Sequence, residues 1–130
     1  MSRLLLALSG IQVMGRGRWR ELRSLVGLRR ATEMARRYAL LARHQLFEPD
    51  WYMARYHDLA GKVADPLLHF LVSGWREGRD PGARFDVHYY RTRHADVARS
   101  GVDPLLHYLS CGKAEGRSAI RPPPPSAAPP

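Results

Sequence analysis

The sequence predicts an all-α fold in which two 38-residue repeats of short helices pack together and follow a basic amphipathic helix. Three observations lead to this expectation. Sliding the chain against itself by 38 residues aligns 47–81 with 85–119 without a gap, and 15 of the 35 aligned positions are identical. Residues typical of helix starts recur in both repeats. Neither repeat contains the sustained apolar–polar alternation of a strand.

Length and charge divide the chain into regions. Its 130 residues and 14.8 kDa suit one small domain with flanking segments and exclude a large enzyme core. The formal net charge is +9, and residues 1–46 carry +8 of it, whereas 47–121 carry only +1. This asymmetry predicts two regions with different functions.

Three segments follow from these patterns. Residues 1–46 form an Arg-rich amphipathic helical segment interrupted at Gly15, Gly17 and Gly27, 47–120 a tandem repeat domain, and 121–130 a disordered tail with six prolines. The uncharged stretch at 4–15 has twelve residues, whereas about 20 are needed to span a bilayer. We expect no transmembrane helix there, and a cleaved export signal remains an alternative.

Residues 28–46 have the periodicity of an amphipathic helix. The apolar stripe is Ala31, Met34, Ala35, Tyr38, Leu41 and Ala42. The opposite arc carries Arg29, Arg30, Glu33, Arg36, Arg37, Arg43 and His44. In one interpretation the stripe packs on the repeats and the arginines are solvated. In the other, the five arginines bind an anionic surface, either phospholipid head groups or nucleic acid.

Each repeat contains helix-start and helix-stop signals. Asp65-Pro66 and Asp103-Pro104 have the order of an N-cap followed by proline at the first helical position. Gly74 and Gly112, nine residues after each cap, predict left-handed helix ends. Upstream, a short helix opens at Glu48-Pro49 in the first repeat and at Asp86 in the second, and a capped turn then ends near Gly61 and Gly101.

The candidate ligand or partner surface consists of the recurring aromatic and polar residues, namely Trp51, Tyr52, Tyr89, Tyr90, Glu77, Arg79, Glu115, Arg117, His69 and His107. The aromatic rings either fill the core or stack on sugar rings. The Glu-Gly-Arg sequences either cap helix ends or present a carboxylate and a guanidinium to a sugar or phosphate. The histidines are expected to be hydrogen-bonded packing residues rather than metal ligands.

The sequence does not favour an enzyme. It lacks a phosphate-binding glycine loop, a nucleophile elbow and an Asp-x-Asp pair. With a single cysteine, Cys111, and no tight His or Cys cluster, we expect no metal site, no cofactor and no internal disulfide.

The repeats resemble a short module that accompanies bacterial glycosyltransferases and polysaccharide-synthesis proteins. The second repeat carries its pattern as Phe85-Asp86, Tyr90, Asp96-Val97-Ala98, Gly101-Val102-Asp103-Pro104-Leu105-Leu106-His107-Tyr108-Leu109 and Gly112-Lys113-Ala114-Glu115-Gly116-Arg117. The matching region is the accessory module, without the catalytic domain.

The resemblance implies a non-catalytic adaptor or binding module in cell-surface polysaccharide biosynthesis. Its expected partners are a glycosyltransferase or other polysaccharide-assembly protein, the glycan itself, and an anionic membrane surface. We expect it in the cytoplasm, peripheral on the inner membrane. The alternative is a nucleic-acid-binding basic protein, supported by the charge of residues 1–46.

Overall fold

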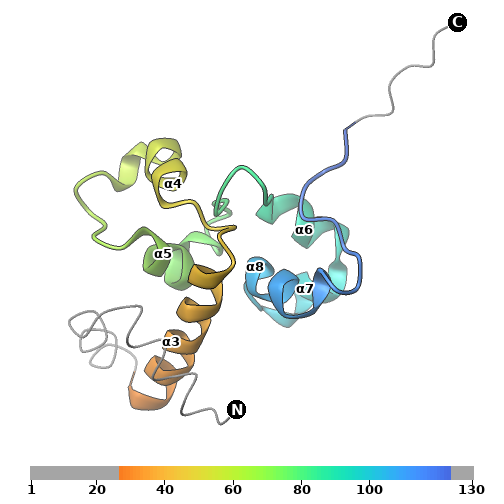
Figure 1. Cartoon of the computed structure of the whole chain (residues 1–130), viewed down its shortest axis with the longest axis horizontal. Helices are drawn as coiled ribbons and strands as arrows, with labels where there is room; N and C mark the ends of the chain where they lie inside the picture. Colours follow the sequence, from red (N-terminus) through yellow and green to blue (C-terminus); the bar gives the residue numbers. More distant parts are fainter. Residues whose placement is uncertain (1–26, 124–130) are drawn as a thin grey trace, which may run out of the picture.

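The computed structural model describes residues 27–123, which Figure 1 shows in colour. Between those bounds every regular element is a helix, and the one β-type pairing is an isolated bridge between Gly82 and Phe85. The predicted all-α class is therefore confirmed for this part of the chain. The predictions made for 1–26 and 124–130, including the uncharged stretch, two of the glycine interruptions and most of the proline tail, lie outside the described residues.

Helix α3 (Leu28–Arg43) is the longest helix that the structure describes. It follows Gly27, whose φ of 79° sets the chain direction before the first turn. Its buried residues are Ala31, Ala35, Tyr38, Ala39 and Leu41. Because α3 contacts both α5 (Pro66–His69) and α8 (Pro104–His107), its apolar face joins the two halves of the molecule. Ala42, assigned to the apolar stripe from sequence, is exposed because it faces a hollow instead of a packed side chain.

Two segments of similar helix order follow α3. The first segment (47–81) contains α4 (Pro49–Arg55), the short 3-10 helix η1 (His57–Leu59), α5 and the π-helical turn η2 (Phe70–Gly74). The second segment (85–119) contains α6 (Val87–Arg93), α7 (Ala95–Ser100), α8 and the π-helical turn η3 (Tyr108–Gly112). Figure 1 shows α4 and α5 on one side of the molecule and α6, α7 and α8 on the other.

The predicted helix starts at the Asp-Pro pairs are confirmed. Asp65 Oδ1 accepts a hydrogen bond from the backbone N–H of Leu68 at 3.2 Å, and Asp103 Oδ1 accepts one from Leu105 at 2.9 Å. In each case the proline that follows occupies the first turn of the helix. Such caps satisfy backbone donors that have no partner inside the helix.

The predicted left-handed ends at Gly74 and Gly112 are wrong. In the first segment the left-handed residue that follows η2 is Gly78, with φ 78°. The N–H of Arg79 bonds the carbonyl of Gly74 at 2.9 Å, and the N–H of Gly78 bonds that of Trp75 at 3.2 Å. These two bonds form a Schellman motif, whose glycine lies four residues beyond the predicted one.

The second segment ends in the same way. Gly116 has φ 75°, the N–H of Arg117 bonds the carbonyl of Gly112 at 2.9 Å, and the N–H of Gly116 bonds that of Lys113 at 3.1 Å. The Glu-Gly-Arg sequences are therefore helix stops. Gly74 and Gly112 instead lie inside the helical turns, as the last residues of η2 and η3.

Each segment also closes on itself through one backbone hydrogen bond. The N–H of Glu48 donates to the carbonyl of Pro81 at 2.9 Å, and the N–H of Asp86 donates to the carbonyl of Ala119 at 3.0 Å. Both bonds join the beginning of a segment to its end. Each segment is therefore a closed unit whose two ends lie side by side.

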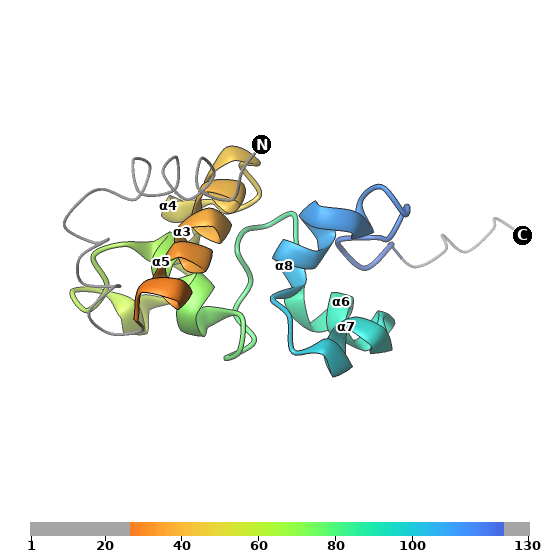
Figure 2. The same cartoon turned by 90° about the horizontal axis from the view of Figure 1, so that it is seen from below.

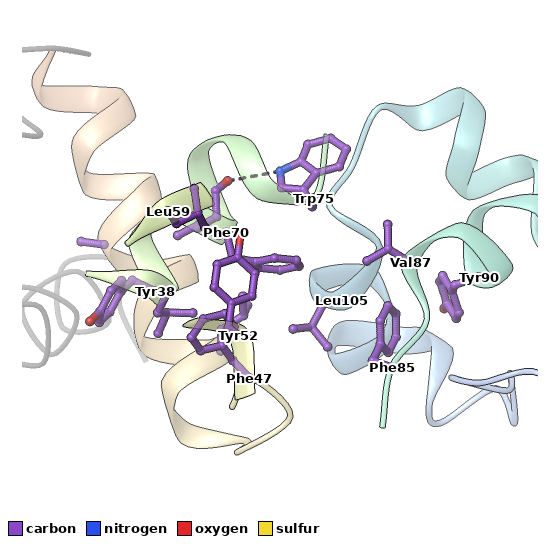
Figure 3. Close-up of a cluster of buried hydrophobic side chains, with 14 of the residues drawn as sticks. Tyr38, Phe47, Tyr52, Leu59, Phe70, Trp75, Phe85, Val87, Tyr90 and Leu105 are labelled. Atoms are coloured by element: carbon purple, nitrogen blue, oxygen red, sulfur yellow. Dashed lines mark hydrogen bonds between the residues drawn. The ribbon is translucent and has the colours of Figure 1, made fainter. Parts of the chain in front are cut away.

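The core joins the two units through aromatic and aliphatic side chains (Figure 3). In the first segment the rings of Phe47 and Tyr52 lie 5.2 Å apart between centroids, and in the second the rings of Phe85 and Tyr90 are also 5.2 Å apart. Leu105, which is completely buried, lies between these groups in Figure 3. Helices this short are marginal alone, so this shared core stabilises both units.

Candidate functional site

A buried tyrosine, a histidine and a glycine meet inside the first segment. The hydroxyl oxygen of Tyr52 lies 2.8 Å from Nδ1 of His69, and the two side chains share a hydrogen bond. Tyr52 is completely buried. A Cβ atom at Gly74 would overlap the same hydroxyl oxygen, so only glycine fits there without a shift of the tyrosine. We call this arrangement the Tyr-His-Gly lock.

The second segment contains the same lock, built from Tyr90, His107 and Gly112, again with 2.8 Å between the hydroxyl oxygen and Nδ1. Burial raises the pKa of Tyr90 to about 12. Burial also raises the pKa of Tyr52 and lowers the pKa of His69. Both tyrosine rings are completely buried, so they offer no face on which a sugar could stack.

Arg79 is held by two carboxylates of its own segment. Its Nη1 and Nη2 donate to the two carboxylate oxygens of Asp58 at 2.9 and 2.6 Å, and its Nε donates to Glu77 at 2.7 Å. The guanidinium carbon also lies 4.8 Å from the ring centroid of Tyr56. We call this set of bonds the arginine clamp. The arginine clamp joins η1, which contains Asp58, to the chain just after η2, which contains Glu77 and Arg79.

Arg117 forms the equivalent clamp in the second segment. Its fork donates to both carboxylate oxygens of Asp96 at 3.0 Å, and its Nε donates to Glu115 at 2.7 Å. The hydrogen bond from Arg117 lowers the pKa of Asp96 to about 2. Neither interpretation of Glu-Gly-Arg foresaw this bond, because the aspartate lies 21 residues before the arginine. In each clamp three of the five guanidinium N–H groups bond carboxylates of the protein.

Trp51 and Tyr89 are the two candidate aromatic residues that remain partly exposed. The ring of Trp51 meets that of Tyr56 edge-on, with 6.3 Å between centroids. The guanidinium carbon of Arg121 lies 6.0 Å from the ring centroid of Tyr89. These two rings, unlike those of Tyr52 and Tyr90, are accessible to a ligand.

A hollow of about 410 Å³ lies beside Trp51, and its polar lining comes from Gln45, Glu48, Asp50 and Arg84. Two of these side chains already have protein partners. Glu48 accepts a hydrogen bond from the backbone N–H of Ala83 at 2.8 Å, and Arg84 donates one to the carbonyl of Gln45 at 2.5 Å. The hollow thus combines the partly exposed ring of Trp51 with four polar side chains, two of which are fixed by hydrogen bonds. Its lining is more polar than that of most small-molecule sites, which are mainly apolar with a few polar groups.

The five arginines predicted to bind an anionic surface separate into two groups. Arg29, Arg30 and Arg43 are exposed along α3. The apolar face of the same helix is packed against the two segments. Any attraction of α3 to an anionic surface is therefore electrostatic, since its apolar side chains are not free to insert into a bilayer.

Arg36 and Arg37 face the second segment. Arg36 Nη2 lies 2.6 Å from Glu33 Oε1, and Arg37 Nε lies 3.4 Å from the same oxygen. With Leu106 and Ser110 these side chains line a hollow of about 310 Å³. The helical wheel predicts that both arginines face solvent. In the structure, Leu106 of α8 and Ser110 of η3 lie beside that face of α3.

Cys111 lies close to one of the histidines. Its Sγ is 3.3 Å from Nε2 of His107, one helical turn earlier. The spacing of four residues is visible in the sequence. At the equivalent position of the first segment stands Ser73, so the thiol is not part of the arrangement that the segments share.

Residues 27–123 contain no group of three His, Cys, Asp or Glu side chains that could hold a metal ion. In the same part of the chain, no helix has the length and apolarity needed to cross a bilayer. No protein-family model, curated protein or solved structure matches the chain.

Proposed function

We propose that the protein is a non-catalytic binding module of bacterial cell-surface polysaccharide biosynthesis. In this proposal residues 47–120 are a tandem-repeat domain that binds a glycosyltransferase or its glycan, and α3 is a basic amphipathic helix that holds the domain at the inner membrane surface. The hollow beside Trp51 is the observation that carries the proposal. The arginine clamps and the Tyr-His-Gly locks support the proposal indirectly. Their repeated polar side chains bond one another and stabilise the fold, which leaves the Trp51 hollow as the candidate binding site.

The Trp51 hollow has the features that a sugar-binding subsite needs. A pyranose ring presents apolar C–H groups on one face and hydroxyls at its edge. The indole of Trp51 matches the apolar face, and the side chains of Asp50 and Gln45 stand beside it as hydrogen-bond partners for hydroxyls. Because Arg84 and Glu48 are anchored to backbone groups, the rim of the hollow is preorganised.

Changing Trp51 to alanine should weaken binding to surface polysaccharide by about fivefold, since a well-placed aromatic contact contributes on the order of 1 kcal/mol. The measurement is retention of the tagged full chain on immobilised polysaccharide from the native bacterium. The matched control is Tyr89→Ala, at the equivalent position of the second segment, which should bind like the original protein.

The same tagged chain, recovered from nuclease-treated native cells, should bring down glycosyltransferases or polysaccharide-export components. Failure to retain polysaccharide together with failure to recover such proteins would overturn the proposal. Recovery of nucleoid or ribosomal proteins that disappears after nuclease treatment would also overturn it, and would establish the nucleic-acid alternative.

The proposed membrane contact depends on the three exposed arginines of α3. A basic residue near an anionic bilayer contributes about 1 kcal/mol, so Arg29→Gln/Arg30→Gln/Arg43→Gln should weaken binding on the order of 100-fold. The measurement is co-sedimentation with phosphatidylglycerol/phosphatidylethanolamine vesicles at low salt. Deleting residues 1–46 would be a poor test, because it strips the packed face of α3 from the core.

A charge-matched control separates a local contact from the total charge of the protein. Arg55→Gln/Arg93→Gln/Lys113→Gln removes three exposed charges elsewhere. This variant should lose little binding. Equal losses in the two triple variants would show that α3 makes no specific membrane contact.

A further inference from the structure

A second hollow of about 410 Å³ lies between the two segments and has a basic lining. Val87, His88, Arg91 and Thr92 reach it from α6, and Arg99 reaches it from α7. The backbone of the first segment contributes Gly78. Helices α6 and α7 lie side by side in both views of the molecule (Figures 1 and 2).

The two arginines of this hollow are not used by the scaffold. Arg79 and Arg117 are bound to carboxylates in the clamps, but Arg91 and Arg99 form no ion pair within residues 27–123. The residues that line the hollow include no carboxylate. Two guanidinium groups, charged at every physiological pH, therefore border the same cavity without a counter-ion in the part of the chain that the structure describes.

The first segment provides an internal comparison. At the positions equivalent to Arg91 and Arg99 it has Met53 and Gly61, and at the position of His88 it has Asp50. The first segment nevertheless has the same helix order, clamp and lock. The basic side chains are therefore not required to fold a segment, and they distinguish the second segment from the first.

We propose that this hollow binds the phosphate group of a small phosphomonoester or free phosphate. A phosphomonoester carries a charge of about −1.5 to −2 at neutral pH, which matches two guanidinium groups better than the single charge of a carboxylate. Guanidinium groups also bind phosphate through paired N–H donors. The hydroxyl of Thr92 already donates to the carbonyls of His88 and Tyr89, so the two guanidinium groups supply the donors for the phosphate. Ala95 and Ala98, both exposed, provide an apolar wall for the body of an ester.

The test is a titration of the ¹⁵N-labelled full chain, in phosphate-free buffer, with inorganic phosphate, glucose 1-phosphate and glucuronate. The amides of Gly78, Thr92 and Ala95 should shift with both phosphate probes, and glucuronate should bind at least about tenfold more weakly. Equal affinity for the two phosphate probes identifies the free anion as the ligand. Tighter binding of glucose 1-phosphate identifies an ester.

Arg91→Gln and Arg99→Gln should each raise the dissociation constant by about tenfold or more, since a hydrogen bond to a charged group contributes about 1.5–3 kcal/mol. The control is Arg93→Gln, which removes an exposed charge from α6 without touching the hollow. No shift of the three amides at millimolar phosphate would overturn the proposal. So would an equal loss in Arg93→Gln, or glucuronate binding as tight as phosphate.

This site is separate from the Trp51 hollow, which belongs to α4 and its surroundings. Failure of either binding test leaves the other unaffected. Trp51→Ala should not change the phosphate titration, and Arg91→Gln should not change retention on polysaccharide.

Discussion

Replacing Asp103 with asparagine should raise the free energy of unfolding at pH 8 by about 2 kcal/mol. Asp103 is 1% exposed, and its Oδ2 has no hydrogen-bond partner in the described part of the chain. Burial raises the pKa of this carboxyl to about 7. Asparagine keeps the acceptor that caps Leu105 and removes the buried charge.

The same change should remove part of the pH dependence of stability. Between the ordinary carboxyl value of 3.8 and about 7, the folded protein holds a proton on Asp103 that the unfolded chain has released. Stability therefore falls as the pH rises through this interval. Urea unfolding across pH 4–8 should show a smaller fall for Asp103→Asn than for the original protein.

Asp65→Asn is the matched control, since Asp65 is the equivalent cap of the first segment. Its Oδ2 accepts a hydrogen bond from the hydroxyl of Tyr38 at 2.8 Å. In asparagine an NH2 group faces this hydroxyl, so Tyr38 must accept instead of donate and the bond to a charged carboxylate is lost. Stability should therefore fall by about 1 kcal/mol. If both variants lose stability alike at pH 8, the buried charge of Asp103 is not destabilising.

Gly74→Ala should destabilise the protein by about 1–3 kcal/mol, even though alanine favours helix formation. The new Cβ would overlap the hydroxyl of Tyr52, a rigid buried group held by His69. Tyr52→Phe removes that hydroxyl, so Gly74→Ala should cost about 1 kcal/mol less in the Tyr52→Phe background. Chemical unfolding of the four proteins in this cycle measures the coupling.

Gly78→Ala supplies the contrast. No atom lies within 4 Å of a Cβ at Gly78, but its φ of 78° is unfavourable for alanine, and the cost should be about 1 kcal/mol. This cost should be the same with and without the Tyr52 hydroxyl. Coupling of equal size at Gly74 and Gly78 would mean that the overlap with the hydroxyl is not the cause.

The features predicted correctly are those that a few neighbouring residues determine. Asp65-Pro66 and Asp103-Pro104 start helices because cap and proline act within one turn. The all-helical class likewise follows from local signals. Gly74 was misassigned because its role depends on the hydroxyl of Tyr52, 22 residues earlier in the chain, and nothing beside Gly74 indicates that contact.

The candidate site was predicted less well, for the same physical reason. Arg79 and Glu77 stand out in the sequence as recurring polar residues, but the carboxylate of Asp58 that binds the arginine lies 21 residues away. Tyr52 stands out in the sequence as an aromatic residue, but sequence alone does not separate this buried residue from its neighbour Trp51, which is partly exposed. The helical wheel of α3 shows one helix only, so it did not show α8 beside Arg36.

The closing hydrogen bonds have a consequence for how such a protein can evolve. The bond from Glu48 to Pro81 and the bond from Asp86 to Ala119 each lie within one unit. Each unit is therefore closed by a hydrogen bond between its own residues. Gene duplication can therefore add a copy without redesigning the copy already present. Because these bonds join backbone atoms, the side chains at their ends can differ between the units, as Glu48 and Asp86 or Pro81 and Ala119 do. A substitution at such a position therefore leaves the closing bond in place.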